Sequence, residues 1–255
     1  MAKNKGSLGK RKVMKSVVGV IPARFGASRF PGKPLALIAG VPMIVRVIRQ
    51  ALKAKSLTEV WVATDDRRIA EVVERNGALA VMTPKTCRSG TDRIACALKG
   101  RSVGWVVNIQ GDEPVIAPEA IDAAVEVLRR DPKVLMSTVV IPLKNPREWK
   151  DPNIVKAVLA KNGDVLYFSR APIPHPREGG MPPAYKHMGL YGYRPEWLLR
   201  MAALPPTPLE IAEKLEQLRA MENGVTIRAA VRCVESIAVD TPSDVKKVEK
   251  YLAGC

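Results

Sequence analysis

The chain has 255 residues, of which 47% are hydrophobic and 26% charged, a balance that is typical of one globular domain and excludes disorder along the whole chain. Its longest uncharged stretch, residues 34–45, is shorter than the roughly 20 apolar residues that a transmembrane helix needs, so no membrane insertion is predicted. The formal net charge of +16 suits nucleic acid, nucleoside triphosphates and acidic sugars alike, and charge alone does not choose among them.

The first segment of the chain is basic and has no apolar periodicity. It holds six lysines and arginines before residue 16 and no acid, which predicts a flexible, solvated tail over residues 1–16. The apolar run at 16–23 is short and leads directly into Arg24, unlike a signal peptide. The four cysteines show no CxxC pairing, and the expected location is therefore the reducing cytoplasm.

Strand and helix patterns alternate through the first half of the chain. Apolar, β-branched-rich runs predict strands at 17–21, 60–63, 79–82 and 105–109. Apolar side chains at helical spacing, caps and prolines predict helices at 44–52, after Asp65 and Asp66, at about 91–99, and from Pro118. This βαβ repetition predicts an α/β fold, with a mostly parallel, Rossmann-like sheet flanked by helices.

The second half of the chain breaks this rhythm. Strand-like runs separated by Pro, Asn and Gly lie at 134–141, 155–159, 165–168 and 190–193. Asn162-Gly163 indicates a hairpin, and the proline-rich stretch 173–183 predicts a loop. Thr207 and Thr241 each begin a predicted helix with a capping box. We expect one domain over 17–255 that carries a smaller β-rich lobe at about 141–193.

The loop after the first strand, residues 21–35, reads IPARFGASRFPGKPL. Ligands of open parallel sheets bind beyond the carboxyl ends of strands, where glycines let backbone N–H groups approach phosphates and cations such as Arg24 and Lys33 neutralise them. The loop is not a Walker loop, because its two glycines are six residues apart and Pro34 replaces the Ser or Thr that holds magnesium. From spacing alone, a phosphate-binding loop and an ordinary solvated loop remain equally open.

Two acidic residues follow strand patterns. Asp112 lies in QGDEP, after the fourth strand, and Asp240 ends the last short strand in IAVDTP. Carboxylates at two strand ends can share Mg²⁺, which prefers oxygen ligands. Each also has a plainer interpretation, as a turn residue for Asp112 and a helix-capping acid for Asp240. The segment Ser89-Gly90-Thr91 is either a helix cap or a contact to a nucleobase, and His187 alone is more often a structural histidine.

Seven motifs identify a family. In chain order they are IPARFGASRFPGKPL, SGTDRI, VNIQGDEP, YFSRAPIP, HMGLYGY, PLEIAEKLEQLRAMENG and VDTPSDV. In this order they resemble the 3-deoxy-manno-octulosonate cytidylyltransferases, and the resemblance covers residues 17 to about 250. It implies a nucleotidyltransferase fold and an enzyme that transfers CMP from CTP to the anomeric hydroxyl of the acidic sugar 3-deoxy-D-manno-octulosonate (Kdo). The products would be CMP-Kdo for lipopolysaccharide biosynthesis and pyrophosphate, with Mg²⁺ as cofactor.

The resemblance also implies residue roles, with Arg24, Lys33 and Asp112 as the catalytic group. The expected nucleotide-binding residues are Ala23, Arg24, Lys33, Ser89, Gly90, Thr91 and Arg93. The expected magnesium ligands are Asp112 and Asp240. The expected sugar-binding residues are Gln110, Arg170, His187, Tyr191, Glu216 and Gln217. Arg170 would face the sugar carboxylate, because a guanidinium fork matches a carboxylate.

Several alternatives remain at this point. Within enzymes, the nearest rival is a cytidylyltransferase for another acidic sugar, such as sialic acid or an amino analogue of Kdo. A specific nucleic-acid binder is disfavoured, because no helix-turn-helix pattern or aromatic-interleaved basic stretch is present. An inactive interaction module is disfavoured by intact Lys33, Asp112 and Asp240. A homodimer through the β-rich lobe is expected, since that lobe needs its sheet edges covered.

Overall fold

The computed structural model describes residues 16–26, 30–234 and 237–254. The predicted tail, apart from Ser16, lies outside this part of the chain. The strands are β1 (Val17–Ala23), β2 (Leu37–Ile38), β3 (Val41–Pro42), β4 (Glu59–Thr64), β5 (Leu79–Met82), β6 (Trp105–Asn108), β7 (Met136–Leu143), β8 (Lys156–Leu159), β9 (Val165–Ser169), β10 (Ala184–Tyr193) and β11 (Ile227–Val231). The helices are α1 (Met43–Ala51), α2 (Arg67–Glu74), α3 (Gly90–Leu98), α4 (Pro118–Arg130), α5 (Pro146–Lys150), α6 (Pro195–Ala203), α7 (Pro208–Glu213), α8 (Gln217–Glu222) and α9 (Pro242–Ala253), with a short 3-10 helix, η1 (Lys33–Leu35).

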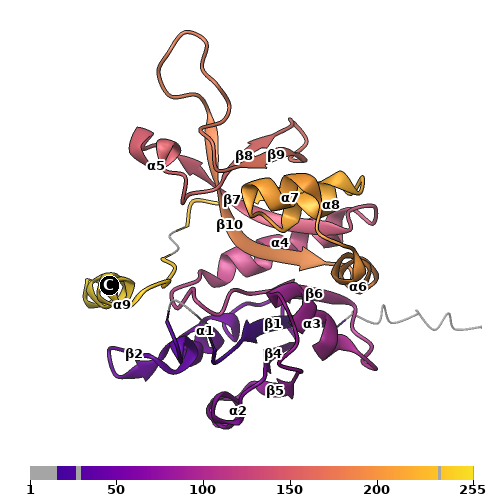
Figure 1. The fold of residues 1–255 in the computed structure, drawn as a ribbon, viewed down its shortest axis with the longest axis vertical. Coiled ribbons are helices and arrows are strands. Elements are labelled where there is room, and N and C mark those ends of the chain that lie inside the picture. Colours follow the sequence, from indigo (N-terminus) through magenta and orange to yellow (C-terminus); the bar gives the residue numbers. More distant parts are fainter. Residues whose placement is uncertain (1–15, 27–29, 235–236, 255) are drawn as a thin grey trace, which may run out of the picture.

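The main sheet has the order β11-β7-β10-β6-β1-β4-β5. The run β6-β1-β4-β5 is parallel throughout, as the βαβ repetition predicts. β10 lies antiparallel between β6 and β7, and β11 pairs in parallel with β7 at the edge. The predicted mostly parallel, Rossmann-like sheet is therefore confirmed, with one antiparallel strand inserted (Figure 1).

Helices cover both faces of this sheet. Buried side chains of α1, α2 and α4 pack in one apolar cluster with β1 and β4. Side chains of α3, α6 and α8 pack in a second cluster, which includes Trp61 and Tyr193 from the sheet. This arrangement is the one that amphipathic helices between parallel strands require. No helix among the described residues is both long and apolar enough to cross a membrane.

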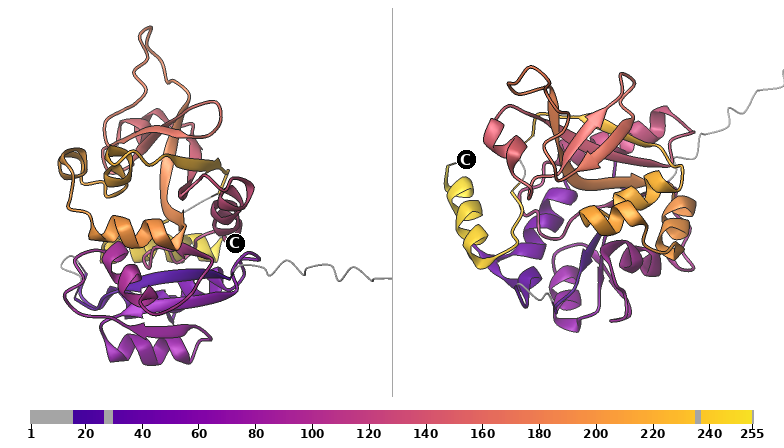
Figure 2. Two further views of the ribbon diagram at one scale, coloured as in Figure 1. Left: turned by 90° about the vertical axis from the view of Figure 1, so that its right-hand side faces the viewer. Right: turned by 45° about the horizontal axis from the view of Figure 1, so that its top comes forward.

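The β-rich region projects beyond the main sheet. β8 and β9 form the antiparallel hairpin predicted at Asn162-Gly163, and β8 pairs with the first part of β10. The loop 171–183 extends from this lobe at the top of Figure 1, and Figure 2 shows the same projection from the side. β10 begins six residues earlier than the apolar pattern predicts, because pairing with β7 and β8 carries it through the polar Lys186 and His187.

Candidate active site

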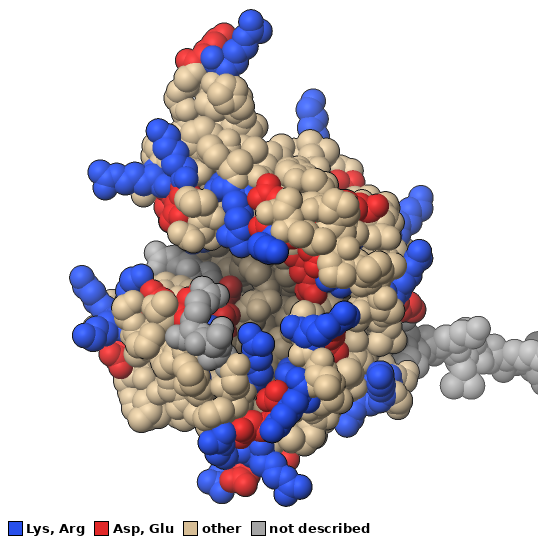
Figure 3. All heavy atoms as spheres, viewed as in Figure 1, with Lys and Arg blue, Asp and Glu red and all other residues tan. Residues whose placement is uncertain are grey.

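Two neighbouring cavities lie at the carboxyl ends of β1 and β6. The first cavity, of about 340 Å³, is lined by Pro22, Ala23, Arg24, Phe30, Lys33, Pro34, Cys87, Arg88, Ser89, Gly90, Arg93, Gln110, Gly111, Asp112 and Asp240. The second cavity, of about 280 Å³, is lined by Gly90, Thr91, Asn108, Gln110, His187, Gly189, Tyr191, Leu215, Glu216 and Gln217. They share Gly90 and Gln110, so ligands in the two cavities would touch. Figure 3 shows this face hollowed between the two halves of the molecule, with lysine and arginine side chains around the rim.

Lys33 lies between the two predicted metal ligands. Its Nζ donates to Asp112 Oδ2 at 2.8 Å and to the backbone oxygen of Val239 at 2.7 Å, and lies 3.6 Å from Asp240 Oδ1. The loop that carries Asp112 and the loop that carries Asp240 are joined by a backbone hydrogen bond from Val239 N to Asp112 O. Both carboxylates therefore face the Lys33 ammonium, although they are 128 residues apart in the sequence. Asp112 follows β6, but the strand predicted to end at Asp240 is absent, and Asp240 lies in the loop before α9.

Close backbone packing fixes the acidic loop against the first strand. A Cβ atom at Gly111 would lie 2.9 Å from the backbone oxygen of Pro22, a distance that only glycine avoids. The turn into η1 passes through Gly32 with φ of 70°, which again favours glycine. These two glycines bring Lys33 and Asp112 to the same cavity.

The start of α3 closes the other side of the first cavity. Ser89 caps the helix by accepting from Asp92 N at 3.1 Å, and the exposed backbone N–H groups of a helix start favour anions. Arg93 is 3% exposed and is held by Thr83 Oγ1 at 2.7 Å and Asp65 Oδ2 at 3.0 Å. Arg93 thus contributes a fixed positive charge to the wall of the cavity.

The second cavity is polar and uncharged on the side of β10. Burial lowers the pKa of His187 to about 3, so the ring is neutral near pH 7, with Nε2 3.0 Å from Thr138 Oγ1. Burial, and next the charge of Glu216, raise the pKa of Tyr191 well above its ordinary value, so its hydroxyl keeps its proton. Three further polar atoms of the lining are buried and lack a hydrogen-bond partner among the described residues: Asn108 Oδ1, Glu216 Oε1 and Gln217 Nε2. Such atoms need partners, so the wall of this cavity carries hydrogen-bonding capacity that the described side chains do not use.

All the predicted site residues except Arg170 line one of these cavities. Arg170 lies in the β-rich lobe, where its Nε donates to the backbone oxygen of Glu213 at 2.8 Å and its Nη1 to that of Pro152 at 3.0 Å. Its contact with a sugar carboxylate therefore stays a prediction.

Other residues of the site escaped the sequence argument. Asn108 could have been found from the sequence, because it is a polar residue at the end of an apolar strand. Arg219 could have been found as well, because it follows Glu216 by three residues in LEQLR. Asp65 and Thr83 hold Arg93. Apart from their positions after strands, no sequence pattern marks them as site residues.

The cytidylyltransferase family model matches residues 18–227. The 3-deoxy-manno-octulosonate cytidylyltransferase of Myxococcus xanthus is 53% identical, over 92% of this chain and 96% of that protein. The protein of the same name from Syntrophotalea carbinolica is 49% identical, over 94% of this chain and 99% of its own. Among solved structures, a CMP:2-keto-3-deoxy-manno-octonic acid synthetase complexed with CTP superposes with a TM-score of 0.90 at 40% identity, covering 94% of this chain and 99% of that one.

Proposed function

The chain belongs to the 3-deoxy-manno-octulosonate cytidylyltransferase family, and we propose that it transfers CMP from CTP to the anomeric hydroxyl of Kdo. The products are CMP-Kdo, which serves lipopolysaccharide biosynthesis, and pyrophosphate. One observation carries this proposal: a basic cavity with two carboxylates opens directly onto a polar cavity with unpartnered hydrogen-bonding atoms. The solved relative complexed with CTP supports CTP as the nucleotide substrate.

The residues of the first cavity bind and orient the triphosphate. Arg24, Lys33 and the start of α3 neutralise its charge, and the segment Ser89–Arg93 lies against the cytidine. The hydroxyl oxygen of the sugar bonds to the α-phosphorus while the bond from that phosphorus to the β-phosphate oxygen breaks, and the hydroxyl proton leaves to solvent. No protein nucleophile is needed, so the residues act by positioning the substrates and by stabilising charge. Lys33 stabilises the negative charge that develops on the leaving pyrophosphate.

Asp112 and Asp240 are the residues that would hold Mg²⁺. Both offer hard carboxylate oxygens, and both already approach one positive group, the Lys33 ammonium. Its Nζ lies 2.8 Å from Asp112 Oδ2 and 3.6 Å from Asp240 Oδ1. Within the described residues, no group of three or more His, Cys, Asp and Glu side chains is placed to bind a metal, so water and substrate phosphates would complete the shell, as is usual for Mg²⁺. When bound, the ion neutralises phosphate charge and favours ionisation of the attacking hydroxyl.

The residues of the second cavity orient the sugar. Neutral His187, the Tyr191 hydroxyl, Gln110, Glu216 and Gln217 offer donors and acceptors to its hydroxyl groups. The chain acts as a homodimer through the lobe at about 141–193 and works in the cytoplasm, on two soluble acidic substrates.

Pyrophosphate release tests this proposal. CTP, Mg²⁺ and Kdo are supplied together, and then CTP is replaced by ATP or UTP and Kdo by sialic acid or an amino analogue of Kdo. We expect the highest kcat/KM for the pair CTP and Kdo. A higher kcat/KM with sialic acid, with the amino analogue or with UTP would contradict the assigned substrates.

A further inference from the structure

The carboxylate of Glu216 joins the two cavities. Its Oε2 accepts a 2.5 Å hydrogen bond from Thr91 Oγ1, and Thr91 is buried in the first turn of α3, directly after Ser89 and Gly90 of the first cavity. Its Oε1 is buried and lacks a hydrogen-bond partner among the described residues. Whatever fixes this carboxylate therefore sets where the Glu216 wall of the second cavity lies relative to α3 and the first cavity.

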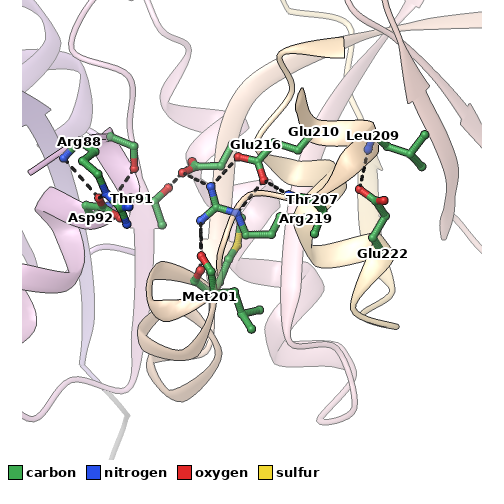
Figure 4. A network of polar contacts seen from close by, with 12 residues as sticks. Arg88, Thr91, Asp92, Met201, Thr207, Leu209, Glu210, Glu216, Arg219 and Glu222 are labelled. Carbon is green, nitrogen blue, oxygen red and sulfur yellow. Dashed lines mark hydrogen bonds and ion pairs between the residues drawn. The ribbon is translucent and has the colours of Figure 1, made fainter. Parts of the chain in front are cut away.

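Arg219 lies directly behind this carboxylate. Its side chain is 7% exposed, it lines neither cavity, and its Nη2 lies 3.6 Å from Glu216 Oε1. Figure 4 shows the Arg219 guanidinium next to Glu216 and Glu210, with Met201 below it. The guanidinium is thus close enough to attract Glu216 but is not part of the cavity wall.

The guanidinium is itself held in place. Its Nε donates to Glu210 Oε2 at 2.7 Å and its Nη2 to Glu210 Oε1, a bidentate pair, and its Nη1 donates to the backbone oxygen of Met201 at 3.2 Å. Glu210 is fixed in turn, because its carboxylate accepts from Thr207 N in the capping box of α7. A planar fork held on two sides has one orientation, which a lysine ammonium would not reproduce.

The charge of the proposed substrate explains why an arginine lies behind Glu216. Kdo is an acid, and the carboxylate of Glu216 in the wall of the sugar cavity would repel it without a counter-charge. Arg219 supplies that counter-charge from the side of Oε1, which is buried away from the cavity. Glu216 can therefore line the cavity at a smaller electrostatic penalty.

We propose that Arg219 is a positioning residue for the sugar, which acts by holding and neutralising Glu216 between Thr91 and the substrate. This inference rests on the proposed function, because it takes the occupant of the second cavity to be an acidic, hydroxyl-rich sugar. Arg219 does not touch either substrate. Its effect passes through Glu216 alone, and that dependence is what an experiment can measure.

A double-mutant cycle on sugar affinity tests the proposal. We expect Arg219→Gln to raise the KM for Kdo by ~10-fold or more and the KM for CTP by less than about threefold, since only the sugar contact is displaced. In a Glu216→Gln background the same change should raise the KM for Kdo by less than about twofold, because coupled residues are not additive. Arg219→Lys, which keeps the charge and loses the fork, should give an intermediate KM.

Arg228 provides a matched control. It also holds two carboxylates, those of Asp131 and Asp164, each at 2.7 Å, and it lines neither cavity. Arg228→Gln should lower Tm and leave the KM for Kdo unchanged. If Arg219→Gln does not fold, the cycle is run with Arg219→Lys.

Additive effects of Arg219 and Glu216, or equal rises in both KM values, would overturn the proposal and give Arg219 a structural role. The wild-type rate with CTP and Kdo is measured first. A wild type that is inactive with Kdo would overturn the proposed function and this inference together, so the two failures are distinguishable.

Discussion

Replacing Lys33 by alanine is the sharpest perturbation of the first cavity. The change removes an ammonium that lies 2.8 Å from Asp112 and 3.6 Å from Asp240. It also removes the cation assigned to the charge that develops on pyrophosphate. Loss of one such preorganised group typically lowers turnover by ~100- to 1000-fold, or about 3–4 kcal/mol of transition-state stabilisation. We therefore expect kcat to fall by at least ~100-fold.

The effect on stability should be much smaller. The side chains of Asp112 and Asp240 are 29% and 50% exposed, so water solvates them once Lys33 is gone. We expect the free energy of unfolding to fall by about 1 kcal/mol, which is roughly 2–4 °C in Tm for a chain of this size. A large loss of activity in a folded protein separates a catalytic role from a structural one.

The assay is steady-state pyrophosphate release, with CTP varied at saturating Kdo and Kdo varied at saturating CTP. Arg130→Ala serves as the control, because Arg130 forms an exposed ion pair with Glu126 at 2.9 Å and lines neither cavity. It should leave both dependences unchanged. If Lys33→Ala keeps a normal kcat and CTP dependence and changes only the Kdo dependence, the assignment of Lys33 to the triphosphate is wrong.

Four further results are expected. Asp112→Asn and Asp240→Asn should each lower turnover by at least ~100-fold with the fold retained, because each loses a charged metal ligand; a near-wild-type rate at saturating Mg²⁺ would remove that residue from the metal site. Burial lowers the pKa of His187 from 6.5 to about 3, so the unfolded chain binds the extra proton and stability falls as the pH drops below about 6.5. His187→Asn should therefore lose less Tm than wild type between pH 7 and pH 4.5, and equal losses would contradict the shift. Light scattering at micromolar protein should give the mass of a dimer. A monomer mass that does not change with concentration would contradict this expectation. A chain beginning near Ser16 should keep its kinetics with CTP and Kdo while it loses retention on heparin, and a tenfold fall in its activity would show that the tail reaches the active site.

The sequence predicts the parallel half of the fold well because its signals are local. The β-branched run at 17–21 and the helix patterns that follow fix strand and helix residue by residue, and short βαβ connections leave few ways to arrange them. The insertion of β10 between β6 and β7 depends instead on pairing between strands far apart in the chain. No local pattern encodes that order, or the length that β10 gains through Lys186 and His187.

The same division applies to the site. Lys33 and Asp112 follow β1 and β6, and the carboxyl ends of these neighbouring parallel strands meet at one edge, so their meeting was predictable. The strand expected to end at Asp240 is wrong, because the described residues between β11 and α9 form no strand. A loop brings Asp240 to the site instead, held by the backbone hydrogen bond from Val239 N to Asp112 O. The surroundings of Arg170 depend on how the β-rich lobe folds back on its own Pro152 and packs against Glu213, which spacing does not reveal. The pair between Arg219 and Glu210 likewise needs the turn between α7 and α8, where Lys214 adopts a φ of 55°.

The fate of the α-phosphorus of CTP shows whether CMP is transferred to Kdo. The enzyme is incubated with Mg²⁺, Kdo and CTP that carries a radioactive label on either the α- or the γ-phosphorus, and the products are separated. We expect the α-label to appear in a cytidine-monophosphate sugar and the γ-label in pyrophosphate, in equal amounts. Label from the γ-phosphorus on the sugar, or α-label in free CMP with no labelled sugar, would contradict transfer of CMP to Kdo.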